Sequence, residues 1–202
     1  MLWPLRDHRA DDTASRLRRG AEVRPCGDCF DRMPHRGYPP VTTRRNSLRY
    51  PGHDYREAGS YFVTIRTFGH QRLFGQVSGA SVLLTRQGEA VERAWLDIAT
   101  TFPGVIVDTH LIMPDHLHGI LMLGTDPAIP PTHSLRDLVG WFKNRTHAEY
   151  RHRVAAGVWP PYRGKLWQRS YHDHIIRNDR ELDAYRGYVE GNPSRWWERH
   201  RQ

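Results

Sequence analysis

Two strand-like runs follow each other in the middle of the chain, at residues 105–113 and 116–123, with only Pro114 and Asp115 between them. A connection this short joins antiparallel neighbours, because parallel strands need a crossover of a dozen or more residues. The two runs therefore predict an antiparallel strand pair closed by a tight turn. This pair constrains the fold more than any other feature of the sequence, because the remaining segments have to pack around it.

The rest of the chain alternates between strand patterns and helix patterns. β-branched and aromatic residues bounded by turn residues mark strands or extended segments at residues 61–66, 73–77, 81–84 and 167–171. Apolar residues at three- and four-residue spacing mark helices over 85–102, from 134 onward and over 178–192. This order predicts an α+β domain in which helices pack on an antiparallel sheet.

The second of the two central runs carries His116 and His118, with the apolar Leu117 between them. Successive side chains of a strand point to opposite faces, so the two imidazoles share one face. Two imidazoles around a metal with open positions can grip a phosphodiester. Two structural histidines held by hydrogen bonds are the alternative, and spacing alone does not decide between the two interpretations.

The same spacing recurs at His172 and His174, which flank Asp173. With 13 His in 202 residues, chance supplies roughly one such triplet, so the spacing needs support from its context. An aspartate between the two histidines would point into the opposite face of a packed strand. A structural role or a contact with DNA is therefore favoured over metal binding for His172 and His174.

A second set of reactive groups lies on the predicted helix over 178–192. Tyr188 and Asn192 are four residues apart and share a helix face, with Tyr185 on the same stripe. A phenol can act as a covalent nucleophile, and a nearby amide oxygen can complete the coordination of a metal. Spacing does not choose between Tyr185 and Tyr188, and a stripe that only packs on the sheet is the alternative.

The net charge of +8 comes almost entirely from arginine, since Lys143 and Lys165 are the only lysines. Arginine pairs with phosphate oxygens and stacks on bases, which suits a nucleic-acid partner, although a bias in genome composition also produces arginine-rich chains. Trp167 is as compatible with the protein core as with DNA. The candidate DNA-contacting residues are Arg136, Lys143, Arg145, Arg169 and Arg177.

Residues 1–45 hold many Arg, Asp, Gly and Pro without a sustained apolar period, which predicts a flexible basic extension, or sequence added by an upstream start, ahead of a domain over 46–202. The only two cysteines, Cys26 and Cys29, lack the further ligands of a zinc ribbon and the strand-helix context of a redox motif. No run of 18 apolar residues and no signal-peptide layout occurs. We therefore expect a cytoplasmic protein without a membrane partner, associated with the nucleoid when bound to DNA.

Four motifs occur in the order seen in the single-tyrosine HUH transposases: Tyr61-Phe-Val-Thr, Met113-Pro-Asp-His-Leu-His-Gly, Trp167-Gln-Arg-Ser-Tyr-His-Asp-His-Ile-Ile-Arg-Asn and Tyr188-Val-Glu-Gly-Asn-Pro. Over about residues 45–197 the chain resembles the REP-associated tyrosine transposases within that superfamily. The resemblance implies a ferredoxin-like or RRM-like α+β domain. It also implies that the histidine pair lies on a central strand and the nucleophilic tyrosine on a C-terminal helix.

By this resemblance, His116, His118 and Asn192 are the ligands of Mg²⁺ or Mn²⁺, and Tyr188 is the nucleophile. The implied activity is that of a single-stranded DNA endonuclease and strand transferase, monomeric or homodimeric, which acts at hairpin-forming sites through a 5′-phosphotyrosine intermediate. Asp115 departs from the family, which more often has Asn or another polar residue there. Its carboxylate either strengthens cation binding or repels the substrate phosphate.

Two other functions stay open. A catalytically inactive RRM-like protein would hold structured DNA or RNA without metal-dependent cleavage. A two-histidine metal oxygenase would need Asp115 or Glu190 as its carboxylate ligand, and strand alternation predicts that Asp115 faces away from His116.

Overall fold

The computed structural model describes residues 57–126 and 128–200. The predicted basic extension over 1–45, the boundary at residue 46 and both cysteines lie outside the described residues. The strands are β1 Gly59–Arg66, β2 Gly75–Ser78, β3 Ser81–Leu84, β4 Val105–Ile112, β5 His116–Leu123 and β6 His172–Ile176. The helices are the short 3₁₀ turn η2 Phe68–His70, α1 Arg86–Thr101, α2 Leu135–Ala155, α3 Asp179–Glu190 and α4 Asn192–His200.

The predicted strand pair forms the centre of the fold. β4 and β5 are antiparallel, and the main-chain N–H of Met113 donates to the carbonyl of His116 at 2.8 Å across the Pro114-Asp115 turn. β1 and β6 complete a four-stranded sheet in the order β4-β5-β1-β6, in which every neighbouring pair is antiparallel. β2 and β3 form the predicted separate hairpin.

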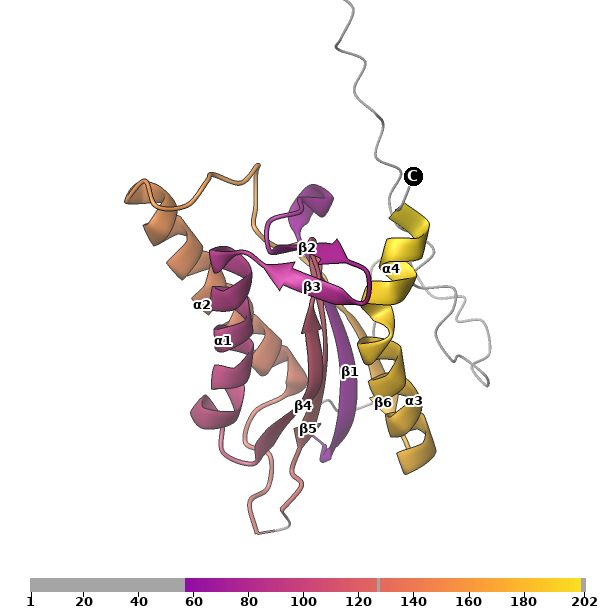
Figure 1. Cartoon of the computed structure of the whole chain (residues 1–202). Helices are drawn as coiled ribbons and strands as arrows, with labels where there is room; N and C mark the ends of the chain where they lie inside the picture. Colours follow the sequence, from indigo (N-terminus) through magenta and orange to yellow (C-terminus); the bar gives the residue numbers. More distant parts are fainter. Residues whose placement is uncertain (1–56, 127, 201–202) are drawn as a thin grey trace, which may run out of the picture. The chain divides into compact units, whose positions relative to one another are not determined.

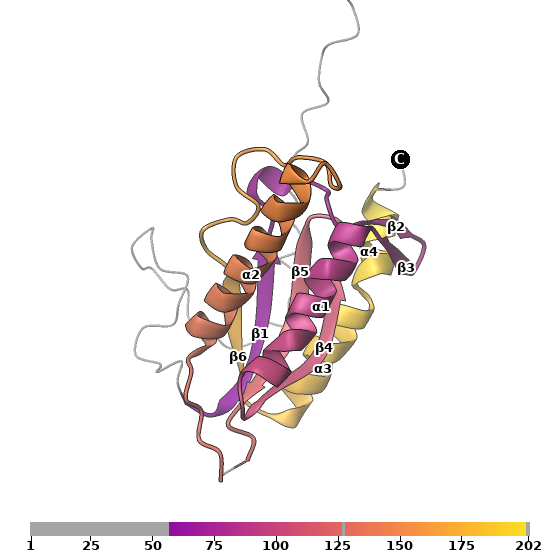
Figure 2. The same ribbon diagram turned by 90° about the vertical axis from the view of Figure 1, so that its left-hand side faces the viewer.

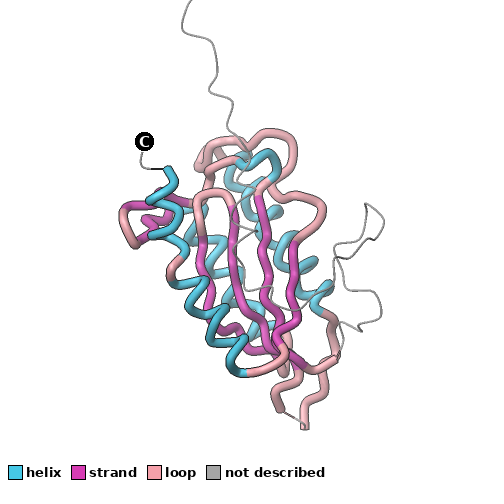
Figure 3. Tube along the Cα trace, turned by 90° about the vertical axis from the view of Figure 1, so that its right-hand side faces the viewer, coloured by secondary structure: helices cyan, strands magenta, loops and turns pink. Residues whose placement is uncertain are grey.

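The chain order β1-α1-β4-β5-α2-β6 is the βαββαβ arrangement of ferredoxin-like domains, so the predicted α+β fold class is confirmed. α1 and α2 lie on one face of the sheet, and α3 and α4 lie on the other (Figure 1). Figure 2 views the face covered by α1 and α2, and Figure 3 shows α3 and α4 beside the strands from the opposite side. Two of these helices, α3 and α4, follow the βαββαβ unit and form its C-terminal addition.

The main hydrophobic core lies between the sheet and the pair α1 and α2. β1 contributes Tyr61, Val63 and Ile65 to this core, which alternate with Phe62 and Thr64 on the opposite face. On β5 the same alternation places Gly119 against α1, where an added Cβ would lie 2.4 Å from a ring atom of Trp95. Only glycine therefore lets the buried Trp95 ring approach the strand that carries the histidine pair.

The extended segment before β6 runs along the end of β1. The main-chain N–H of Phe68 donates to the carbonyl of Leu166 at 3.0 Å, and that of Gln168 donates to the carbonyl of Arg66 at 2.9 Å. Trp167 is buried, and its indole N–H donates to Thr146 Oγ1 at 2.8 Å. Of the two roles considered for Trp167, the structure supports packing in the core.

Within residues 57–126 and 128–200, no helix combines the length and the apolar character needed to cross a membrane.

Candidate metal and tyrosine site

The two histidines of β5 point their outer ring nitrogens at each other. His116 Nε2 and His118 Nε2 are 3.1 Å apart, and both side chains are almost completely buried. Nitrogens that bind one ion at right angles, each about 2.1 Å from it, lie about 3 Å apart. The pair therefore has the spacing of two ligands of one ion, as strand alternation predicts.

The inner ring nitrogens of the same histidines are held by other side chains. His116 Nδ1 lies 2.5 Å from Asp115 Oδ1, and His118 Nδ1 lies 2.8 Å from Thr64 Oγ1. A hydrogen bond at Nδ1 fixes the orientation of the ring and leaves Nε2 as the ligand atom, as in most metal sites built from histidine. Thr64 stands directly opposite His118 on the neighbouring strand β1.

The contact between Asp115 and His116 corrects one expectation. Asp115 does not face away from His116, because it lies in the turn before β5, where the alternation of a strand does not apply. Its carboxylate meets Nδ1, on the opposite side of the ring from the nitrogen that faces His118. In this position Asp115 orients a ligand and is not placed to be the carboxylate ligand of an oxygenase.

Charges around Asp115 keep its carboxyl ionised. Burial opposes ionisation, but the hydrogen bond to His116 and the nearby positive charges of His116, Arg66 and His70 together hold the pKa of Asp115 below its usual range. His70 Nδ1 lies 3.6 Å from Asp115 Oδ2. The buried carboxylate can therefore accept a hydrogen bond from the Nδ1–H of His116 while it stays ionised.

Burial and nearby positive charges both favour the neutral form of His118. Burial, together with the charges of His116, Arg66 and Arg195, moves the pKa of His118 well below its ordinary value. A neutral imidazole is the form that binds metals. The electrostatics of the site thus keep a lone pair available on the buried ring.

Tyr188 lies beside this pair. Its ring centre is 5.5 Å from that of His118 and 5.8 Å from that of Phe62, with the rings edge to face in both contacts. The Arg195 guanidinium carbon lies 4.8 Å from the centre of the Tyr188 ring, and Arg195 Nη2 donates to the Tyr188 carbonyl. Tyr188 is only partly buried, so part of its side chain meets solvent.

Tyr185 occupies a different environment. It is 0% exposed and stacks on Phe62 at 4.7 Å and against His174 at 4.9 Å. These contacts are those of a core residue. The structure therefore separates two tyrosines that the sequence alone did not distinguish, one packed between rings and one at the edge of the histidine pair.

Asn192 lies one helical turn beyond Tyr188, next to the break between α3 and α4. It is 1% exposed, and neither its Oδ1 nor its Nδ2 has a hydrogen-bond partner among the described residues. Trp196, a further turn along, packs on the ring of His116 at a centre-to-centre distance of 5.7 Å. Tyr188 and Trp196 thus contact the two histidines from either side of Asn192.

Two imidazole nitrogens and one amide oxygen are a donor set that fits a divalent cation. A buried amide without partners costs about 1–3 kcal/mol, and coordination of its oxygen would remove part of that cost. In the described ranges, no three residues of the types His, Cys, Asp and Glu gather into a metal site. The Asn192 amide is therefore the candidate that supplies a third donor to the histidine pair.

Comparison with known proteins assigns the chain to a family. Residues 81–192, more than half of the chain, match the family model described as "Transposase IS200 like". The chain belongs to the IS200-like transposase family. A Haemophilus influenzae Rd protein described only as uncharacterized is 31% identical over 161 residues, which cover 75% of this chain and 89% of that protein.

Two solved structures are also similar to this IS200-like transposase. One is a REP-associated tyrosine transposase bound to a REP hairpin, with 19% identity, a TM-score of 0.49 and coverage of 71% of this chain and 72% of that chain. The other is a putative transposase from Deinococcus radiodurans R1, with 20% identity, a TM-score of 0.44 and coverage of 70% and 96%.

The DNA-contacting residues predicted from the sequence do not gather at the histidine pair. Arg136, Lys143 and Arg145 are on α2, on the other face of the sheet. Arg169 and Arg177 are exposed on either side of β6. The positive charges that act on the histidine pair come instead from Arg66 and Arg195.

The side chain of Lys143 is bound to the main chain of the segment before β6. Its Nζ donates to the main-chain carbonyls of Gln168, Arg169 and Ser170 at 3.0, 3.4 and 3.1 Å. Burial lowers the pKa of Lys143 to about 8. The ammonium group therefore fixes the segment before β6 to α2 and is not directed at a phosphate.

His172 and His174 lie on β6 on the same face as the histidine pair. His172 stands opposite Thr64, and His174 stands opposite Phe62. His174 Nε2 lies 2.7 Å from Glu181 Oε1, which fixes the start of α3 to the strand. The contact gives His174 the structural role favoured from the sequence.

The sequence did not single out Arg66 or Arg195, the two arginines whose charges act on His118. Arg66 stands opposite His116 in the β1-β5 register, and both arginines act on the pKa of His118. Arg66 is one residue of a strand pattern, and Arg195 lies beyond the predicted helix. Only strand register and helix docking bring them to the histidines, so no local signal marks either one.

Proposed function

We propose that this IS200-like transposase is a metal-dependent single-stranded DNA endonuclease and strand transferase of the REP-associated type. It acts at hairpin-forming sites through a 5′-phosphotyrosine intermediate. The observation that carries the proposal is the contact of the Tyr188 ring with His118, whose Nε2 converges with that of His116. A partly exposed phenol beside a converging nitrogen pair, in a transposase family, fits nucleophilic attack at a metal-held phosphate.

In this mechanism His116, His118 and Asn192 would hold a divalent cation, Mg²⁺ or Mn²⁺. When bound, the ion would polarise the scissile phosphate as a Lewis acid. Asp115 and Thr64 hold the two rings by Nδ1, so that the two Nε2 atoms face each other. Arg66 and Arg195 add positive charge near His118, which would favour a phosphate at the site.

Tyr188 performs the covalent step. Its Oη loses a proton to solvent and forms a bond to phosphorus, the P–O3′ bond breaks, and the leaving 3′ oxygen takes up a proton. The products are a 5′-phosphotyrosyl link and a free 3′-OH. Attack of a second 3′-OH on the same phosphorus releases Tyr188 and joins the strands, so the energy of the phosphodiester is conserved without ATP.

The closed arrangement of the site sets a condition on this mechanism. His116, His118 and Asn192 are each at most 1% exposed, and the rings of Trp196 and Tyr188 lie against those of His116 and His118. A phosphate reaches the pair only when α3 and α4 shift away from β5. Tyr188 is partly exposed, unlike the three candidate ligands, so DNA can reach part of its side chain before the ligands are uncovered.

A labelled hairpin oligonucleotide with single-stranded flanks, drawn from repeats beside the protein's own gene, tests the proposal. We expect the wild-type protein to form a covalent adduct on a denaturing gel with Mg²⁺ or Mn²⁺ but not with EDTA. Tyr188→Phe should abolish the adduct. Tyr185→Phe is the matched control and should retain it, because its buried ring keeps its packing.

Two results would contradict the proposal. An adduct formed by Tyr188→Phe but not by Tyr185→Phe would show that Tyr185, and not Tyr188, is the nucleophile. DNA binding without metal-dependent cleavage by the wild-type protein would instead support the RRM-like binding protein that has lost catalysis.

A further inference from the structure

The positive charge of the domain is concentrated in one stretch of sequence. Residues 143–170 contain seven Lys and Arg and a single acidic residue, Glu149, which gives a net charge of +6. The whole chain has a net charge of +8. This stretch covers the second half of α2 and the segment that leads to β6. This stretch is therefore the part of the domain that attracts a polyanion most strongly.

Most of these cations are available at the surface. Arg151, Arg163 and Lys165 are exposed, and within the part of the chain that the structure describes none of them has a carboxylate within ion-pair distance. Glu149 pairs instead with Arg153, at 3.9 Å. The three cations thus keep their full charge for an external partner.

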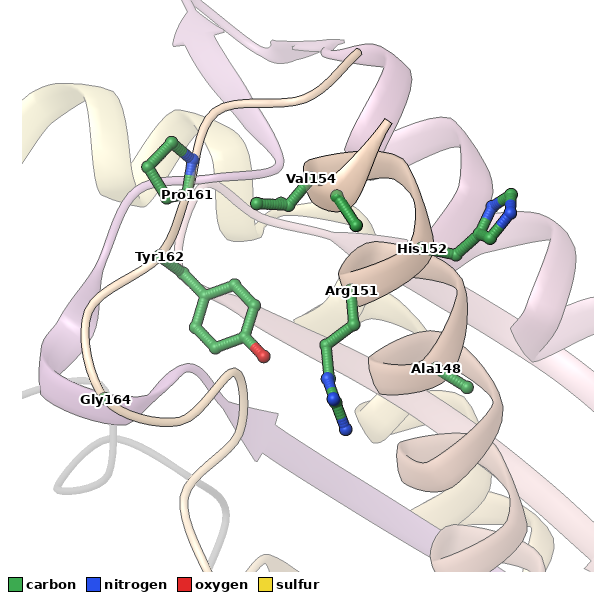
Figure 4. Close-up of a pocket in the computed structure, with 8 residues that line it drawn as sticks. Ala148, Arg151, His152, Val154, Pro161, Tyr162 and Gly164 are labelled. Carbon is green, nitrogen blue, oxygen red and sulfur yellow. The ribbon is translucent and has the colours of Figure 1, made fainter. Parts of the chain in front are cut away.

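A groove of about 660 Å³ lies between the end of α2 and the loop over 161–164. Arg151 from α2 and Tyr162 from the loop point into the same space (Figure 4). Tyr162 is partly buried, and its hydroxyl lies 2.7 Å from His147 Nε2, which fixes the ring as one wall. A cation beside a fixed aromatic ring is the combination that binds a nucleotide, with the phosphate on the cation and the base or sugar on the ring.

The loop that forms this groove is fastened to the end of the sheet that carries His116. The Gln71 side chain donates to the Arg163 carbonyl at 3.0 Å and accepts from the Arg163 N–H at 2.6 Å. Further along, the Gln168 N–H donates to the carbonyl of Arg66, the residue opposite His116. The segment from 163 to 168 therefore connects the groove directly to the edge of the catalytic site.

We infer that this groove, lined by Arg151 and Tyr162 and flanked by the exposed Arg163 and Lys165 on either side of Gly164, is a second DNA-binding site that holds the phosphate backbone of the strand leaving the cleavage point. DNA would pass from the histidine pair across the end of β1 and along residues 163–168 into the groove. The inference rests on the proposed function, because it takes DNA as the polyanion. The sequence-based candidate Arg169 lies beside this path, and Arg145 lies on the same helix as Arg151.

The test compares two triple variants that remove the same charge. Arg151→Gln, Arg163→Gln and Lys165→Gln neutralise the groove, whereas Arg86→Gln, Arg93→Gln and Arg180→Gln neutralise three exposed cations on α1 and α3. Both are made in the Tyr188→Phe protein, so that binding is measured without cleavage. Fluorescence anisotropy then gives Kd for a hairpin with a single-stranded flank at several salt concentrations.

We expect the groove variant to bind the flanked hairpin at least tenfold more weakly and the control variant to bind within about twofold of the parent, since only the first loses phosphate contacts. Each lost contact should reduce the slope of log Kd against log salt by about 0.7 for a single strand or about 0.9 for a duplex. Separate stem and flank oligonucleotides show which of the two the groove holds. Equal Kd values and slopes for both triple variants would overturn the inference.

The proposed function can fail independently of this inference. If the wild-type protein never forms an adduct but the groove variant still loses DNA affinity, the groove is supported and the nuclease is not. Binding of the parent to anionic lipid vesicles that depends on the groove, combined with equal DNA affinity of both variants, would assign the surface to a lipid and refute the DNA site. Circular dichroism melting curves verify that both variants are folded.

Discussion

The guanidinium of Arg195 lies over the ring of Tyr188, 4.8 Å from its centre, and the same side chain donates to the main-chain carbonyl of Tyr188. A cation on the face of a phenol favours the phenolate over the neutral form. An unperturbed tyrosine has a pKa of about 10 and is mostly protonated at neutral pH. Arg195 therefore holds the Tyr188 ring and main chain in place, which is the role expected of a residue that positions the proposed nucleophile.

Arg195→Gln should slow adduct formation about tenfold at neutral pH and move the rise of its pH-rate profile upward, because the phenol loses the cation that lies on its ring. Arg195→Lys should recover part of the rate, since it restores the charge without the planar group. Single-turnover rates between pH 6 and 9.5 measure both effects. A profile of unchanged shape in Arg195→Gln would mean that Arg195 only supports the helix.

Asp115→Asn should weaken metal binding about 10- to 100-fold, because the His116 ring loses the carboxylate that orients it. The same substitution restores the residue type that resembling transposases more often carry. The measurement is the Mn²⁺ concentration that gives half-maximal adduct. Thr64→Val, which removes the partner of His118 Nδ1, should shift this concentration in the same direction. If the metal requirement stays the same in Asp115→Asn, the carboxylate has no role in holding the ligand.

Asn192→Leu separates a ligand role from a structural role. The buried amide has no partner among the described residues, so an apolar side chain of similar size should leave the metal-free protein as stable or raise its free energy of unfolding by about 1 kcal/mol. The same variant should lose the rise in Tm that Mn²⁺ produces in the parent. Thermal melts with and without Mn²⁺ measure both. A metal-dependent rise in Tm equal to that of the parent would exclude Asn192 as a ligand.

The pairing of Asp108 with Arg186 predicts a dependence of stability on pH. Arg186 Nη2 and Nε lie 2.6 and 3.0 Å from the two carboxylate oxygens and fix α3 to β4. The hydrogen bond from Arg186 outweighs burial and lowers the pKa of Asp108 from 3.8 to about 2. The folded state thus gains stability above pH 3.8, and this gain disappears as the pH falls through about 2.

Asp108→Asn should therefore be less stable than the wild-type protein at pH 5 to 7, with the difference shrinking as the pH approaches 2. Urea unfolding at a series of pH values measures it, and Arg186→Gln should give the same trend. A stability difference that does not change with pH would show that packing of α3, and not the ion pair, is responsible.

The local pattern of the sequence was sufficient for the fold class and for most of the secondary structure. It placed an extended segment at 167–171, whereas β6 is His172–Ile176, and it did not predict α4 Asn192–His200. The short Pro114-Asp115 connection required an antiparallel pair, and strand alternation put His116 and His118 on one face, because these constraints act between residues close in sequence. The limits of this reasoning appear at Asp115, which lies in a turn and contacts the ring that alternation predicted it would avoid.

By itself, then, the sequence determined the strand pair and the shared face of the two histidines. It predicted one helix for Tyr188 and Asn192, whereas the structure ends α3 at Glu190 and begins α4 at Asn192. Only the tertiary structure decided which tyrosine lies at the edge of the pair and which is packed into the core, because that depends on how α3 docks on the sheet. It also brought Arg66 and Arg195 to the site and placed Lys143 on the opposite face. These contacts join residues from about 25 to 130 positions apart, where the register of strands and the packing of helices set the distances and no local pattern records them.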